Sequence, residues 1–102
     1  MKLRLIFLLI FSLKSISMTV IDVRTEAEWN SGHLEGAVLL EWQNILQLSS
    51  DISKDEEIFL YCRSGNRSGK ATKILLDAGY IKAKNAGSIS EASKLLGIKI
   101  ID

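Results

Sequence analysis

Short apolar runs alternate with helix-like patterns along most of the chain. Residues 19–23 (TVIDV) are rich in β-branched side chains, which predicts a strand. Thr25 and Glu28 have the spacing of a capping box, so we expect a short helix to begin there and to end at residues 30–32 (NSG). Residues 37–40 are a second apolar run of strand length.

The middle of the chain continues this alternation. A second helix is indicated by three apolar residues at helical spacing, Trp42, Ile45 and Leu46. Residues 49–56 are polar and predict a surface loop. Residues 58–61 (IFLY) form an uninterrupted apolar run, as in a strand buried on both faces of a parallel sheet. Cys62 is expected to be the last residue of that strand.

The C-terminal third predicts two more helices and one more strand. An amphipathic helix is indicated by four residues at i, i+3, i+4 and i+7, which are Ala71, Ile74, Leu75 and Ala78. Gly79 is placed to end it in a left-handed conformation. Residues 83–86 suit a strand, and Ser90 with Glu91 can start a last helix that runs to Leu96.

This order of elements predicts an α/β domain with a parallel sheet covered by helices on both faces. In such sheets, ligands bind beyond the carboxyl ends of the strands. Cys62 is expected at one of these ends, which makes it the first candidate for chemistry.

The N-terminal segment has a different pattern. Lys2 and Arg4 precede an almost wholly apolar run, residues 5–13, and small residues follow at Ser15 and Ser17. These are the features of a secretory signal peptide cleaved after residue 17, and the run is shorter than the about 20 residues of a membrane span. The sequence therefore predicts a signal peptide over 1–17, one domain over 18–102, and an exported, periplasmic protein. A buried N-terminal strand or an uncleaved anchor is the alternative.

Composition limits the function classes. The chain has 102 residues, of which 47% are hydrophobic and 25% charged, so it is one small globular domain. Its net charge is +1, and without residues 1–17 it has 10 basic and 12 acidic residues, or −2. This balance predicts no nucleic-acid partner, and cleavage would leave no stable membrane association.

One cysteine is present, so no disulfide can form within the chain. It precedes the loop Arg63, Ser64, Gly65, Asn66, Arg67 and Ser68, which leads into a helix. Backbone amides of a tight loop, the N-terminal end of a helix dipole and two arginines all favour a thiolate over a thiol. The alternative is a small buried side chain beside a surface turn.

The loop length distinguishes between two chemistries. Four residues separate Cys62 from Arg67. Cysteine phosphatases have a loop one residue longer, which cradles a tetrahedral phosphate, and a histidine before the cysteine, where this chain has Tyr61. The shorter cradle favours a single transferable sulfur atom.

Taken together, these motifs resemble the rhodanese homology family, in particular its small exported single-domain members of the phage-shock type. The matching segments are residues 21–24 (IDVR), 28–29 (EW), 32–37 (GHLEGA), 62–68 (CRSGNRS), 78–80 (AGY) and 85–87 (NAG). The resemblance implies a three-layer α/β/α fold with four parallel strands, of which those containing Val20 and Phe59 are central. Ser88 stands where the family has a second glycine.

The resemblance also implies the roles of the site residues. Cys62 would be the nucleophile that carries sulfur as a persulfide, the amides of residues 63–67 would bind the outer sulfur, and Arg63 would meet the sulfonate of thiosulfate. Asp22, Arg24 and Ser68 would support the loop. The family's histidine, here His33, would be structural, whereas a Cys–His catalytic pair is the alternative.

The expected function is thiosulfate sulfurtransferase activity with cyanide or a thiol as acceptor. No metal or organic cofactor is expected, because a persulfide needs none and one cysteine with one histidine makes no convincing metal site. Two alternatives remain open. One is a module that delivers sulfur to a protein partner, and the other is a small cysteine-dependent phosphatase or arsenate reductase.

Overall fold

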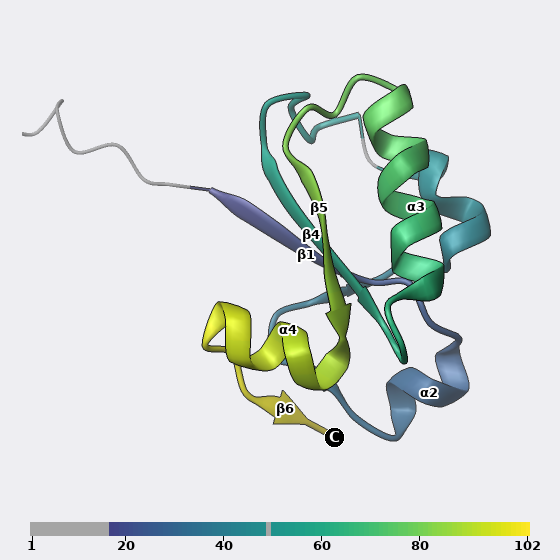
Figure 1. The fold of residues 1–102 in the computed structure, drawn as a ribbon. Coiled ribbons are helices and arrows are strands. Elements are labelled where there is room, and N and C mark those ends of the chain that lie inside the picture. The colour runs from purple at the N-terminus through teal and green to yellow at the C-terminus, as the bar shows by residue number, and fades with distance from the viewer. Residues whose placement is uncertain (1–16, 49) are drawn as a thin grey trace, which may run out of the picture.

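The computed structural model describes residues 17–48 and 50–102 (Figure 1). The predicted signal peptide therefore lies outside the described residues except for Ser17. In chain order the elements are β1 Met18–Asp22, α2 Glu26–Asn30, β2 His33–Leu34, β3 Val38–Leu39, η1 Trp42–Gln47, β4 Glu57–Cys62, α3 Asn66–Asp77, β5 Ala83–Ser88, α4 Ile89–Leu96 and β6 Ile100–Ile101.

Four strands form a parallel sheet in the order β3-β1-β4-β5. Val20 of β1 lies beside Phe59 of β4, which confirms that these two strands are central. All four strands point the same way, so their carboxyl ends meet at one edge of the sheet. A second, two-stranded antiparallel sheet joins β2 to β6, and the sequence pattern did not predict either strand.

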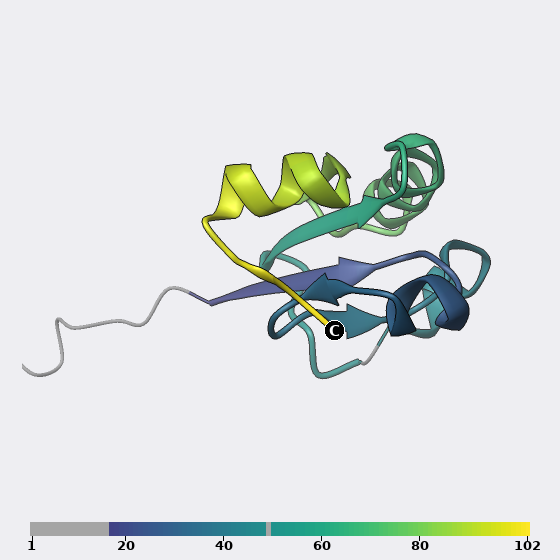
Figure 2. The same cartoon turned by 90° about the horizontal axis from the view of Figure 1, so that it is seen from below.

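Helices cover both faces of the sheet, as the α/β prediction requires. Helix α3 and the 3₁₀ helix η1 pack on one face, whereas α4 packs on the other together with β2 (Figures 1 and 2). Helix α2 follows β1 at the carboxyl edge, near the start of α3 (Figure 1).

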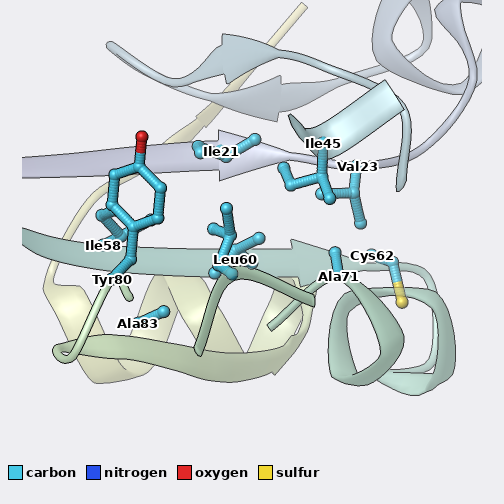
Figure 3. Close-up of a cluster of buried hydrophobic side chains, with 10 residues drawn as sticks. Ile21, Val23, Ile45, Ile58, Leu60, Cys62, Ala71, Tyr80 and Ala83 are labelled. Carbon is cyan, nitrogen blue, oxygen red and sulfur yellow. The ribbon is translucent and has the colours of Figure 1, made fainter. Parts of the chain in front are cut away.

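The hydrophobic core has two parts, one on each face of the sheet. Because side chains alternate along a strand, successive residues of β4 enter different parts. Ile58, Leu60 and Cys62 join the part under α3 (Figure 3), and Tyr61 joins the part under α4. All four are fully buried, which explains why the sequence of β4 is continuously apolar.

One helix boundary differs from the sequence prediction, and one helix is of the 3₁₀ type. The last helix is capped by Ser88 rather than Ser90, because the Ser88 side chain accepts the Glu91 amide and the Glu91 carboxylate accepts the Ser88 amide. Ser88, at the position of the family's second glycine, therefore fits this turn as a helix cap. The segment around Ile45 is a 3₁₀ helix instead of an α-helix, although Ile45 is buried as its spacing indicates.

Candidate active site

Cys62 ends β4 at the carboxyl edge of the sheet, and its side chain is fully buried. Figure 3 shows its sulfur beyond the end of the strand, beside the start of α3. The chain then turns within three residues and enters α3 at Asn66, with Gly65 as the N-cap residue at φ +93°. The short loop thus places the first turn of a helix directly against the sulfur.

Two backbone amides and one hydroxyl of the loop and helix lie close to this sulfur. The Gly65 amide lies 2.9 Å from Cys62 Sγ, and the Ser68 amide and hydroxyl each lie 3.4 Å from it. Gly65 has no side chain that could cap α3. Ser68 is the third residue of the helix, whose amide an N-cap side chain usually binds. The Cys62 sulfur therefore takes the place of a capping oxygen.

This position sets the acidity of the thiol. Burial raises the pKa of Cys62, but hydrogen bonds from the Ser68 hydroxyl and from the Ser68, Ser64 and Gly65 amides outweigh it. The pKa therefore lies below the ordinary value of a cysteine. A thiolate at this point is also stabilised by the positive end of the α3 dipole.

Arg67 does not contribute a free positive charge to the site. Its guanidinium donates to both carboxylate oxygens of Glu28, at 2.8 and 3.0 Å. Glu28 belongs to α2, where its carboxylate also accepts the Thr25 amide in the capping box. The sequence indicates only a capping role for Glu28, and the structure adds its bidentate ion pair with Arg67, which joins α2 to the first turn of α3.

Glu28 gives the fold a specific dependence on pH. The Arg67 hydrogen bonds lower the pKa of Glu28 to about 2 from 4.5, the ordinary value that it regains on unfolding. Because the folded pKa is the lower one, the resulting stability is fully present above about pH 4.5 and is lost as the pH falls toward 2. Glu28→Gln should lack the stability that the ionised Glu28 carboxylate contributes. We expect urea unfolding to show a stability gap between wild type and Glu28→Gln that narrows over this range. A gap independent of pH would contradict the assignment.

Asp22 and Arg24 form a buried pair at the end of β1. Arg24 Nε and Nη2 donate to the Asp22 carboxylate at 2.7–3.1 Å, and Nη2 also donates to the Gly32 carbonyl oxygen at 2.6 Å. These hydrogen bonds connect the two residues with each other and with the turn before β2. Asp22 and Arg24 therefore act at the end of β1, the strand beside β4, and their side-chain hydrogen bonds run to each other and to Gly32.

The predicted residues of the loop differ in their exposure to solvent. Arg63, Ser64 and Asn66 are exposed, whereas Gly65 is half-buried and Ser68 is buried. The structure thus brings Cys62, Gly65, Arg67 and Ser68 together and leaves the exposed three open to solvent. It also adds Asn85 of β5, whose side chain binds both Ser68 Oγ and the Gly65 carbonyl oxygen.

Gly65 is a sterically constrained position of this loop. It combines a positive φ with a close approach, because an added Cβ would lie 3.3 Å from Gly87 Cα. We expect Gly65→Ala to destabilise the fold by about 1–3 kcal/mol and to slow alkylation of Cys62, since its amide binds the sulfur. Gly36→Ala is the matched control, with φ +84° and no atom within 4 Å of the added Cβ. Equal effects of the two substitutions on both measurements would contradict this role of Gly65.

His33 is engaged by Trp29. The two rings stack with their centroids 3.6 Å apart, and His33 Nδ1 lies 3.1 Å from the Trp29 carbonyl oxygen. These contacts tie β2 to α2 and agree with a structural histidine.

Residues 17–48 and 50–102 contain no group of three or more histidine, cysteine, aspartate or glutamate side chains that could hold a metal ion. None of the helices in this part of the chain has both the length and the apolar character needed to cross a membrane.

Most of the chain is similar in sequence to known proteins. Residues 11–93 match the Rhodanese-like domain. Thiosulfate sulfurtransferase PspE of Escherichia coli is 29% identical over 73 residues, which cover 70% of each protein. The adenylyltransferase and sulfurtransferase UBA4 of Lodderomyces elongisporus is 35% identical over 77 residues, which are 66% of this chain but only 17% of that protein.

Solved structures show the same fold. The solved structure of a rhodanese with anions from E. coli superposes with a TM-score of 0.75, and the match covers 84% of this chain and 99% of the other. Its sequence identity is 24%, so this likeness concerns the fold.

Proposed function

Because the chain belongs to the Rhodanese-like domain family of sulfurtransferases, we propose that it transfers the sulfane sulfur of thiosulfate through a persulfide on Cys62. The observation that carries the proposal is the Cys62 sulfur bound by the Gly65 and Ser68 amides at the start of α3. This arrangement stabilises negative charge on sulfur, which both a thiolate and a persulfide carry.

The reaction has two half-reactions. The Cys62 thiolate attacks the sulfane sulfur of thiosulfate, a new S–S bond forms, the S–S bond of thiosulfate breaks, and sulfite leaves with the bonding electrons. Cyanide or a thiol then attacks the outer persulfide sulfur, and the Cys62 thiolate is the leaving group. No net oxidation of the enzyme occurs over the cycle.

Each residue of the loop has a defined part in this proposal. The amides at the start of α3 bind the anionic sulfur, and Arg63, exposed beside Cys62, meets the sulfonate of thiosulfate. Arg67 keeps the first turn of α3 in place through Glu28 instead of acting as a free cation. The family membership favours sulfur over phosphate as the group transferred.

Initial rates with thiosulfate and cyanide varied together test this mechanism. A persulfide intermediate predicts ping-pong kinetics, with parallel lines in double-reciprocal plots, because sulfite leaves before cyanide binds. Intersecting lines would indicate direct transfer within a ternary complex and would contradict the persulfide cycle.

We also propose that residues 1–17 direct export to the periplasm. The support is the basic start, the short apolar run and the small residues before position 18. Fractionation followed by N-terminal sequencing should find Met18 as the first residue in the periplasmic fraction. Protein that keeps Met1 in the cytosolic fraction would contradict export.

A further inference from the structure

Asn85 connects β5 with the active loop through three hydrogen bonds. Its Oδ1 accepts from the Gly87 amide at 2.9 Å and from the Ser68 hydroxyl at 2.7 Å, and its Nδ2 donates to the Gly65 carbonyl oxygen at 3.0 Å. Two of these partners, Gly65 and Ser68, contact the Cys62 sulfur, and the third, Gly87, packs against Gly65. The sequence placed Asn85 in a family motif without giving it any task.

The hydrogen-bond partners of Asn85 determine the direction in which the Ser68 hydroxyl donates its proton. A backbone amide only donates, so the Gly87 bond identifies the accepting side of the Asn85 amide as Oδ1. The Ser68 hydroxyl must then donate its only proton to Oδ1. Ser68 Oγ also lies 3.4 Å from Cys62 Sγ, and with its proton already used it can only accept from the Cys62 thiol.

Loss of the thiol proton reverses the contact between Ser68 and the sulfur. A thiolate or persulfide anion has no proton to give, and the hydroxyl stabilises it only by rotating its proton from Asn85 toward the sulfur. Asn85 Oδ1 tolerates this rotation because it keeps the Gly87 amide as a donor. Removal of the thiol proton to solvent thus couples to rotation of one hydroxyl, and no covalent bond within Ser68 or Asn85 changes.

We propose that Asn85 is a positioning residue that controls the direction of the Ser68 hydroxyl and thereby the balance between thiol and thiolate at Cys62. The proposal rests on the proposed role of Cys62 as the sulfur carrier. In the thiol state Asn85 holds the hydroxyl proton away from the sulfur, and in the anionic states it releases that proton to the sulfur.

The charged groups around the site are few among the described residues. Arg67 of α3 is paired with Glu28 of α2, and Asp22 at the end of β1 is paired with Arg24. Arg63 is exposed in the loop. The Glu91 carboxylate of α4 accepts the Ser88 amide and lies close to Gly87. A neutral substitution at Asn85 or Ser68 replaces none of these charged groups, so the comparison between the variants does not involve a change of net charge.

The test is the rate of Cys62 alkylation by iodoacetamide as a function of pH. We would compare wild type, Asn85→Ala, Ser68→Ala and the double variant. Ser68→Ala should raise the pH at which the alkylation rate is half of its maximum by about one pH unit, because the thiolate loses a charge-assisted hydrogen bond. With Ser68 present, Asn85→Ala frees the hydroxyl to donate to the sulfur and should lower the pH midpoint of alkylation. In the Ser68→Ala background there is no hydroxyl to free, so the same substitution should lower the midpoint by about half a pH unit less.

If the midpoint shifts of the two single variants add up to that of the double variant, Asn85 acts only through the backbone of Gly65 and the proposal is overturned. An unchanged midpoint in Ser68→Ala would overturn it as well, since the hydroxyl would then have no effect on the thiolate. Lys84→Ala is the matched control on β5, with an exposed side chain that pairs with Glu57, and it should leave the midpoint unchanged. Alkylation involves no sulfur transfer, so this result is independent of whether Cys62 forms a persulfide with thiosulfate.

Discussion

Replacing Cys62 by serine is expected to reduce sulfur transfer from thiosulfate to the background rate. The serine hydroxyl is smaller than the thiol and remains protonated at neutral pH. Among the described residues the one histidine, His33, is engaged by Trp29, so it does not serve as the base that would activate the hydroxyl. The loop amides would still bind an anion, so binding without turnover is the expected result. Initial rates of thiocyanate formation measure this loss.

The control for this variant is its stability. Serine can accept the Gly65 and Ser68 amides in place of sulfur, so urea unfolding should show a folded protein. Turnover by a folded Cys62→Ser protein at a substantial fraction of the wild-type rate would contradict the assigned nucleophile.

The largest expected effect on stability comes from Asp22→Ala. It would leave the Arg24 guanidinium buried without its carboxylate, and the Arg24 side chain is only 7% exposed. Removing one partner of a buried ion pair costs about 3–5 kcal/mol, because the remaining charge stays desolvated. Urea or thermal unfolding of the variant against wild type measures this loss.

A double variant shows whether the charge is the cause. Asp22→Ala combined with Arg24→Met removes the unpaired guanidinium and fills part of its volume, so it should be more stable than Asp22→Ala alone. A double variant that is less stable than the single one would show that the loss comes from packing and not from the buried charge.

Much of the fold followed from the alternation of short apolar runs and helical spacings. The strand containing Phe59 is the clearest example, because a strand buried on both faces leaves a continuous apolar run. The two-residue strands β2 and β6 were not predicted, since two residues carry no period. The last helix was placed two residues late because Ser88 and Ser90 are equally good caps by type, and only the fold shows which one meets Glu91.

The site was predictable where its residues are adjacent in the sequence. Cys62, Gly65 and Ser68 fall within one loop, and strand, loop and helix together bring their donors to the sulfur. Glu28 and Asn85 come from other elements, 39 and 17 residues away from their partners Arg67 and Ser68. Their contacts depend on how α2 and β5 lie beside the loop, so local spacing carries no signal for them.

The central claim is that Cys62 accepts one sulfur atom, and intact mass spectrometry tests it most directly. The protein is incubated with thiosulfate and its mass is recorded before and after cyanide is added. The account predicts a gain of one sulfur that cyanide reverses and that Cys62→Ser does not show. An unchanged mass after thiosulfate, or a gain that persists in Cys62→Ser, would contradict it.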